Sequence, residues 1–226
     1  MNNLRFRCLV IDHDDTSVNS TPSIHYPAFL EAMKMMRPGY EGISLEDYFI
    51  KNFDPGFGDF LKKELGFSDR EMLEEFKVWR SFTERMTPEF FPGFLEMLEE
   101  FKISGGYVAV VSHSEKEIIE RDYTRNTSFK PDIVFGWDHD HEKRKPHPYP
   151  VKEIMKYFGL KKEDVLVLDD LKTGLIMARK AGVKFAAAGW AYDIKYIRDF
   201  MKAESDYYFY SINELADFLF YKWISR

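Results

Sequence analysis

The chain has 226 residues, of which 45% are hydrophobic and 31% charged, a composition typical of a soluble globular protein. Its formal net charge of -6 argues against binding to nucleic acid or to anionic membranes, because both need a basic protein face. No apolar stretch approaches the roughly 20 residues of a membrane span, and the first strand begins too early to leave room for a signal peptide. The one cysteine, Cys8, excludes an internal disulfide. We therefore expect a cytoplasmic protein without nucleic-acid or membrane partners.

The first expected element is a buried strand that ends in a cluster of acids. Residues 9–11 read Leu-Val-Ile, and Asp12, Asp14 and Asp15 follow directly. In open α/β sheets this position, just beyond the carboxyl end of a strand, is where ligands bind. Two carboxylates about 4 Å apart repel each other by about 4 kcal/mol at an effective dielectric of about 20. The sequence therefore predicts that a cation lies beside these acids.

The next seventy residues are expected to be almost wholly helical. Apolar residues recur at helical spacing, Ser44 with Asp47 suggests a capped helix start, and Pro38-Gly39 and Gly66 suggest helix ends. The expected helices cover residues 28–36, 44–49, 57–65 and 68–86. A helical segment inserted directly after the acidic loop would overhang the strand ends and could act as a lid.

From Pro88 onwards strands and helices alternate. Helices are expected over 93–103, 115–124, 150–158 and 171–181, and strands over 107–111, 132–135, 165–168, 184–188 and near 207–209. This alternation predicts an α/β fold with a doubly wound, Rossmann-like parallel sheet that includes the first strand. The predicted domains are a catalytic core, residues 1–19 and 88–226, and a small α-helical cap, residues 20–87.

Two further segments place polar side chains at strand or loop ends. Ser112-His113-Ser114 follows a buried strand, where a hydroxyl and the backbone amides of a helix start can hold a phosphate-sized anion. The same serine could be a simple helix N-cap. Farther along, Pro146 restricts the backbone of Lys145, which would aim its ammonium group reproducibly. Its positive charge would offset part of the electrostatic repulsion among the acids.

A second strand also ends in adjacent acids, Asp169 and Asp170. Helix capping explains a lone aspartate well, but it explains poorly why two strands deliver paired acids to the same edge. Oxygen ligands of this kind suit a hard divalent cation such as Mg²⁺, which also accepts phosphate oxygens. Zinc is not supported, because His139 and His141 have no thiol partner.

Taken together, these segments resemble the signature motifs of the haloacid dehalogenase-like (HAD) superfamily. The four matching segments, in chain order, are Asp12-His13-Asp14-Asp15-Thr16, Ser112, Lys145-Pro146 and Asp169-Asp170. The helical insertion is similar to the small cap of the branch that contains phosphoglycolate phosphatase and β-phosphoglucomutase. The resemblance covers nearly the whole chain.

The resemblance implies a role for each matching residue. Asp12 would be the nucleophile, and Asp14 would protonate the leaving oxygen and later deprotonate water. Ser112, the backbone amide of His113 and Lys145 would hold the phosphoryl group. Mg²⁺ would be bound by Asp12, the backbone carbonyl of Asp14 and Asp170, with Asp169 as a ligand or supporting residue.

Four residues depart from the family pattern or are less well placed by it. His13 stands where the family usually has an apolar or aromatic residue, His113 where Asn is common, and Asn19 where Asp is common. The two histidines are candidates either for substrate contact or for supporting roles. His25 lies one residue from a cap histidine position of the mutase branch and is a further candidate substrate contact.

The resemblance predicts a Mg²⁺-dependent phosphatase that hydrolyses a small phosphorylated metabolite through an aspartyl-phosphate, as a monomer or homodimer. A phosphomutase of the β-phosphoglucomutase type is the nearest alternative. A dehalogenase would have no use for the metal-binding acids, and a phosphonatase would need a cap lysine that nothing here marks. A phosphorelay receiver is disfavoured by motif order and length, and a non-catalytic binding protein by the intact set of residues.

Overall fold

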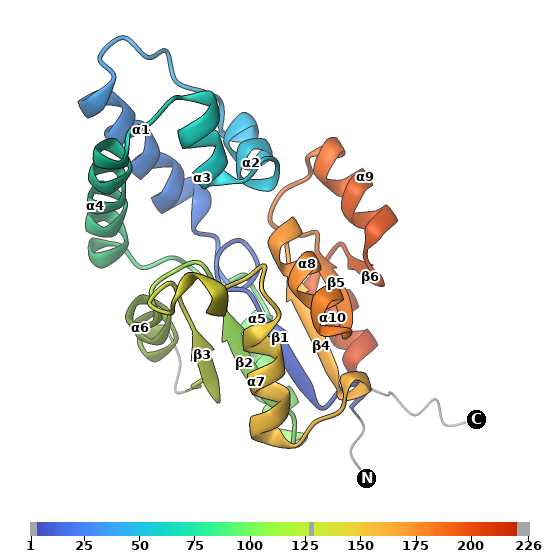
Figure 1. Ribbon diagram of the computed structural model, residues 1–226. Helices are drawn as coiled ribbons and strands as arrows, with labels where there is room; N and C mark the ends of the chain where they lie inside the picture. The colour runs from blue at the N-terminus through green and yellow to red at the C-terminus, as the bar shows by residue number, and fades with distance from the viewer. Residues whose placement is uncertain (1–3, 127–128, 221–226) are drawn as a thin grey trace.

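The computed structural model describes residues 4–126 and 129–220, and its centre is one parallel sheet of six strands (Figure 1). The strand order is β3-β2-β1-β4-β5-β6, so the first strand lies inside the sheet between β2 and β4. This confirms the expected doubly wound α/β fold. The strands are β1 (Cys8–Ile11), β2 (Tyr107–Val111), β3 (Ile133–Phe135), β4 (Val165–Asp169), β5 (Lys184–Ala188) and β6 (Tyr207–Phe209).

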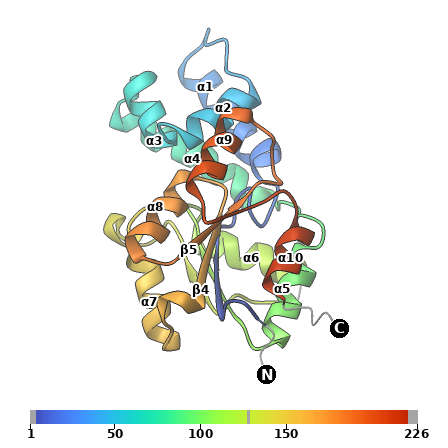
Figure 2. The same ribbon diagram turned by 90° about the vertical axis from the view of Figure 1, so that its right-hand side faces the viewer.

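Helices cover both faces of the sheet because successive strand residues point to opposite sides. Leu9 and Ile11 pack with α5, α6 and α10, whereas Cys8 and Val10 pack with α7, α8 and α9 (Figure 2). Short 3₁₀ turns precede α7 and β4. The core helices are α5 (Phe94–Ile103), α6 (Lys116–Asn126), α7 (Tyr149–Phe158), α8 (Lys172–Ala181), α9 (Lys195–Glu204) and α10 (Ile212–Leu219).

A helical insertion, residues 21–85, separates β1 from α5 and has an apolar cluster of its own. Phe29, Met33, Tyr48, Phe60 and Leu61 are buried together in it. The capping expectation is confirmed at Ser44 and at Ser68, whose hydroxyls accept backbone N–H groups at the starts of α2 and α4. The insertion comprises a π-helical turn (Thr21–His25), α1 (Tyr26–Met36), α2 (Leu45–Phe53), α3 (Phe57–Asp59), a second π-helical turn (Phe60–Glu64) and α4 (Asp69–Arg85).

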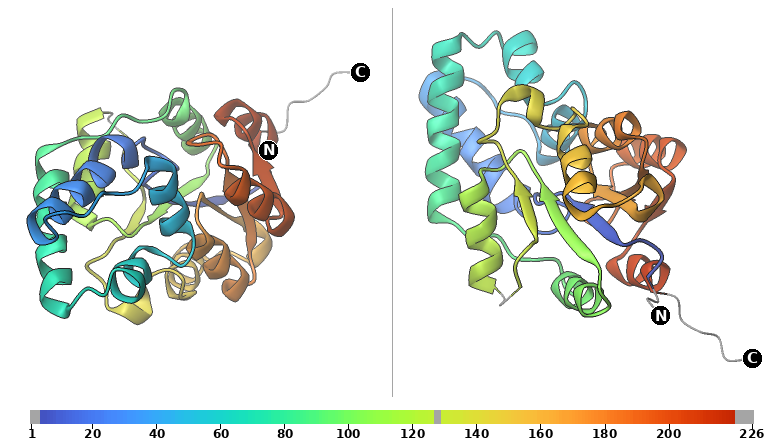
Figure 3. Two further views of the ribbon diagram at one scale, coloured as in Figure 1. Left: turned by 90° about the horizontal axis from the view of Figure 1, so that it is seen from above. Right: turned by 60° about the horizontal axis from the view of Figure 1, so that its bottom comes forward.

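The insertion lies over the carboxyl ends of the strands (Figures 1 and 3). Its two connecting segments run side by side, because the Asn19 N–H donates to the Glu89 carbonyl and the Phe91 N–H to the Ser17 carbonyl. On the opposite side Phe53 of α2 packs against rings of α9 and belongs to the apolar core of the sheet.

Several elements differ from the sequence prediction. Helical structure begins at Thr21 rather than near residue 28, and α2 continues to Phe53 because its last turn packs on the core. The helices α9 and α10 were not predicted, although both bury an apolar stripe against the sheet. Within the described ranges, no helix combines the length and apolar character that a membrane crossing would need.

Candidate active site

The carboxyl ends of three adjacent strands meet beneath the helical insertion and bring the predicted residues together. β1 leads into Asp12 and Asp14, β2 into Ser112, and β4 into Asp169 and Asp170. These strands are neighbours in the order β2-β1-β4, so side chains up to 158 positions apart in the chain share one edge. Lys145 reaches the same place from the loop between β3 and α7.

Asp12, Lys145 and Asp169 form a buried ionic cluster. The Lys145 Nζ lies 2.8 Å from Asp12 Oδ1 and 2.8 Å from Asp169 Oδ2, and all three side chains are almost fully buried. Burial alone would lower the pKa of Lys145, but the two carboxylates raise it, so the ammonium stays charged. The expected cation beside the acidic loop is therefore present.

A third buried carboxylate makes this cluster acidic overall. One oxygen from each of Asp12, Asp169 and Asp170 lies within 4.8 Å of the others, and a single ammonium group cannot neutralise three carboxylates. Burial and Asp12 raise the pKa of Asp169 to about 7, and burial with its acidic neighbours raises the pKa of Asp170 as well. A hard divalent cation with oxygen ligands fits this charge and this donor set.

Two hydroxyl groups orient Asp170. Thr16 Oγ1 donates to Asp170 Oδ1 at 3.0 Å, and the Tyr192 hydroxyl donates to Oδ2 at 2.9 Å. The Asp169 carboxylate accepts the backbone N–H of Leu171. Contacts of this kind fix the direction in which a ligating oxygen points.

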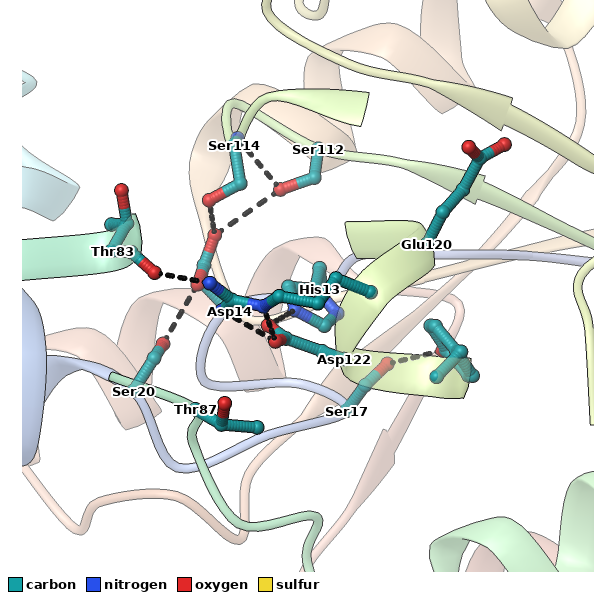
Figure 4. Close-up of polar contacts among 12 residues, drawn as sticks. His13, Asp14, Ser17, Ser20, Thr83, Thr87, Ser112, Ser114, Glu120 and Asp122 are labelled. Carbon is teal, nitrogen blue, oxygen red and sulfur yellow. Dashed lines mark hydrogen bonds and ion pairs between the residues drawn. The ribbon is translucent and has the colours of Figure 1, made fainter. Parts of the chain in front are cut away.

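Asp14 accepts four hydrogen bonds, and Figure 4 shows those from Ser20, Ser112 and Ser114. Its Oδ1 accepts from Ser20 Oγ and His25 Nε2, both at 2.8 Å, and its Oδ2 accepts from Ser112 Oγ at 3.2 Å and Ser114 Oγ at 2.6 Å. Burial would raise the pKa of Asp14, but His25 and the hydrogen bonds hold it well below its usual range. Its carboxylate is not one of the three that cluster around Lys145.

The insertion contacts Asp14 through His25, whose ring is itself held by Trp79 of α4. The indole Nε1–H of Trp79 donates to His25 Nδ1 at 2.9 Å, and the two rings stack. Because Nδ1 accepts this bond, the proton lies on Nε2, which donates to Asp14. Burial would lower the pKa of His25, but the charge of Asp14 and its hydrogen bond raise it. The Trp79 bond needs an unprotonated Nδ1 and therefore favours the neutral ring. His25 was a candidate for substrate contact, and the structure places it on Asp14.

His113 supports the loop that carries Lys145. Its Nε2 lies 3.0 Å from the Lys145 carbonyl oxygen. Burial and the Lys145 charge lower the pKa of His113 to about 4, so the ring is neutral and Nε2–H donates. The imidazole thus helps to position Lys145. A phosphate contact by the His113 backbone amide stays a prediction.

The side chain of His13 points away from the acids at the strand ends and into the core. It is 1% exposed, lies against the rings of Phe90 and Tyr123, and places Nε2 3.1 Å from Asp122 Oδ2. A side chain buried in this way has no open surface for a substrate. The structure therefore brings Asp12, Asp14, Ser112, Lys145, Asp169 and Asp170 to one site but turns the His13 imidazole into the core behind it.

Several residues of the site were not found by sequence reasoning. Ser114, Ser20 and Trp79 bond Asp14 or its partner, and Tyr192 and Thr16 bond Asp170. Ser114 and Thr16 stand inside recognised motifs, so they carried a weak signal. Trp79 and Tyr192 carried none, because an aromatic residue in an apolar stripe normally indicates core packing.

Comparison with known proteins identifies the family of this chain. The family model described as haloacid dehalogenase-like hydrolase matches residues 9–188, so the chain belongs to this family. It is 25% identical to a pyrophosphatase of Halalkalibacterium halodurans, over 95% of this chain and 97% of the relative. It is 28% identical to a phosphoglycolate phosphatase of Aquifex aeolicus, over 82% and 86% of the two chains.

A solved structure supports the fold. The haloacid dehalogenase-like family protein of Streptococcus pneumoniae superposes with a TM-score of 0.73 and 19% identity, covering 93% of this chain and 97% of that one. The match of the family model confirms the resemblance that the motifs suggested.

Proposed function

We propose that the protein is a Mg²⁺-dependent phosphatase that hydrolyses a small phosphorylated metabolite through an aspartyl-phosphate. The observation that carries this proposal is the cluster at the strand ends, in which Asp12 lies 2.8 Å from Lys145 and within 4.8 Å of Asp169 and Asp170. A nucleophilic carboxylate beside a fixed ammonium group and a cation-binding acid pair is suited to phosphoryl transfer, which depends on positioning and charge neutralisation.

In this proposal Asp12 attacks the phosphorus atom while the bond to the leaving oxygen breaks. Asp14 supplies the proton that the leaving oxygen needs, so it enters the reaction protonated and ends it as a carboxylate. In the second step Asp14 takes a proton from water, and the resulting hydroxide attacks the phosphorus and releases phosphate and free Asp12. The low pKa of Asp14 in this arrangement fits the carboxylate form that the second step requires. For the first step Asp14 must gain a proton, and losing its Ser112 hydrogen bond to bound phosphate raises its pKa in that direction.

The remaining residues bind and orient. The Ser112 hydroxyl and the backbone N–H of His113 hold phosphoryl oxygens, and Lys145 spreads the negative charge. A phosphoryl group on Ser112 would compete with Asp14 for this hydroxyl, which releases Asp14 toward the leaving oxygen. Asp12, Asp170 and the backbone carbonyl of Asp14 would hold Mg²⁺, with Asp169 in support. When bound, the ion would neutralise the acids and bind phosphate oxygens.

The helical insertion, residues 20–87, is proposed as the cap that closes the site and selects the substrate. The named activities of the relatives suggest phosphoglycolate and inorganic pyrophosphate as first compounds to test. We predict that the protein acts in the cytoplasm as a monomer or a homodimer.

Phosphate release from a panel of compounds tests the proposal. The panel contains phosphoglycolate, pyrophosphate and sugar phosphates, each with Mg²⁺ and with a chelator in its place, and glucose-1-phosphate isomerisation is followed separately to detect a mutase. Asp12→Asn should reduce turnover by about 10⁴-fold or more while the far-UV circular dichroism spectrum stays unchanged. Turnover that survives in this variant would exclude Asp12 as the nucleophile.

A further inference from the structure

A buried chain of polar side chains links the catalytic loop to helix α6, and no phosphatase motif accounts for it (Figure 4). His13, between Asp12 and Asp14, places Nε2 3.1 Å from Asp122 Oδ2, and both side chains are 1% exposed. The other oxygen of Asp122 accepts from Arg121 Nε at 2.9 Å and from Arg121 Nη2 at 2.6 Å.

Arg121 also binds the end of the helical insertion. Its guanidinium group donates to the carbonyl oxygens of Thr83 at 2.6 Å, Glu84 at 3.2 Å and Met86 at 2.8 Å. The last carbonyls of a helix have no partner within it, and a planar fork of donors can satisfy several at once. Arg121 therefore fixes the end of α4 against the middle of α6.

This series of polar contacts reaches Asp14 by two routes. Through Asp122 it reaches His13, the residue immediately before Asp14 in the catalytic loop. Through Arg121 it reaches α4, which carries Trp79, and Trp79 holds the histidine that donates to Asp14. One adjacent pair of residues on α6, Arg121 and Asp122, thus touches both the loop that bears Asp14 and the helix whose Trp79 holds His25, the partner of Asp14.

A purely structural contact is a poor explanation for this arrangement. His13 Nδ1 is buried and has no hydrogen-bond partner among the residues that the structure describes, and an unsatisfied buried polar atom costs about 1–3 kcal/mol. An apolar ring between Phe90 and Tyr123 would fill the same space without that cost. The polar side chain adds a directional bond to Asp122, which packing alone would not give.

We propose that Arg121 and Asp122 are positioning residues that hold α4 and the catalytic loop in one register, so that Asp14 stays aligned for proton transfer. The catalytic consequence rests on the proposed phosphatase function. The structural link between α4, α6 and the loop does not.

The test compares two phosphate esters of similar size. p-Nitrophenyl phosphate has a leaving group that departs without a proton, whereas benzyl phosphate needs one from Asp14. Asp122→Asn and Arg121→Met should lower kcat/KM for benzyl phosphate by about tenfold or more, and for p-nitrophenyl phosphate by less than about threefold, because general acid help is worth roughly 10²–10⁴-fold. Equal losses for both esters would overturn the proposal, since they would mean fewer active molecules rather than a misplaced acid.

Two controls define the effect. Arg125→Met removes another guanidinium group of α6, which donates to Thr87 Oγ1 just beyond the end of α4 but does not bond the Asp122–His13 pair. The ratio of kcat/KM for the two esters should therefore not change. In an Asp14→Asn background, Asp122→Asn should leave the ratio unchanged because no acid remains to be positioned. A further change of the ratio in that background would contradict the proposal.

Hydrogen exchange tests the link without any activity. In Arg121→Met and Asp122→Asn, the amides of Asp15, Ser17 and Val18, which bond within the catalytic loop, should exchange faster together with those at the end of α4. Exchange that changes only at the end of α4 would overturn the link. A wild-type protein that hydrolyses neither ester with Mg²⁺ would contradict the proposed function, and the exchange result would still decide the link.

Discussion

The two ends of the candidate site are built differently. The end that holds Asp12, Lys145, Asp169 and Asp170 comes wholly from strands and loops of the sheet, is almost fully buried, and is organised by charge. The end around Asp14 is shared, because Ser112 and Ser114 follow β2 whereas His25 comes from the insertion. At 22% exposure, Asp14 is also the more open of the proposed reacting groups.

The geometry of the first end is fixed, whereas the surroundings of Asp14 can change. β1 and β4 are paired strands that cannot move independently, so the sheet sets the distance between Asp12 and the acid pair Asp169 and Asp170, and Lys145 bridges Asp12 and Asp169 from a loop. The partners of Asp14 lie on two bodies joined by two short segments, so its surroundings depend on where the insertion sits. We expect changes at the first end to remove activity and changes at the second to tune it.

Among changes to the residues that surround Asp12 and Asp14, Lys145→Met should have the largest effect. Without the ammonium group Asp12 and Asp169 repel each other in a buried site, so we expect activity to fall by about 10³-fold and the free energy of unfolding by about 3 kcal/mol without metal. Phosphate release and urea unfolding measure both. Lys143→Met, an exposed lysine of the same loop, is the control. Full activity in Lys145→Met would show that metal alone neutralises the cluster.

Asp170→Asn should separate activity from stability. Activity with Mg²⁺ should fall on the order of 10²–10³-fold, but the metal-free protein should become more stable, because one of three repelling buried carboxylates is gone. Thermal unfolding with and without MgCl₂ checks this, with Asp193→Asn as an exposed control. A metal-free protein destabilised by Asp170→Asn would mean that its bonds to Thr16 and Tyr192 outweigh the repulsion.

Trp79→Phe should have a smaller effect, confined to the shared end. The ring remains but the N–H that holds His25 Nδ1 is lost, so His25 can change tautomer or take a second proton. We expect kcat to fall by about tenfold. The His25→Asn variant should be equally impaired with and without Trp79→Phe, because the tryptophan acts through the histidine. Additive losses in the double variant would show an independent role.

Glu75→Gln should change stability alone. Burial raises the pKa of Glu75 in α4 to about 7, so the unfolded chain loses its proton first as the pH rises from 4.5 to 7, and folding becomes less favourable. Glu75→Gln should therefore add up to about 3 kcal/mol to the free energy of unfolding at pH 8 and nothing near pH 4. Urea unfolding at the two pH values measures this. Glu74→Gln, an exposed neighbour, should show no such difference.

Much of the fold was readable in the sequence because the signals were local. Buried strands such as residues 107–111 and 165–168 read as short apolar runs, and Ser44 and Ser68 marked helix starts that the structure confirms. The helices α9 and α10 were not predicted, although each has a clear apolar stripe. The last turn of α2 depends on contact with the core, which local pattern does not contain.

The sequence by itself determined the class of fold, the family resemblance and the set of acids, lysine and serine at the strand ends, because motif order and hydrophobic period are properties of the chain. Only the tertiary structure decided which partners these residues meet. It placed His25 on Asp14, Tyr192 on Asp170, and His13 on Asp122 rather than at the open site. The physical reason is that a hydrogen bond depends on distance and direction in space, and the two groups in each of these bonds come from elements that only the packed fold brings together.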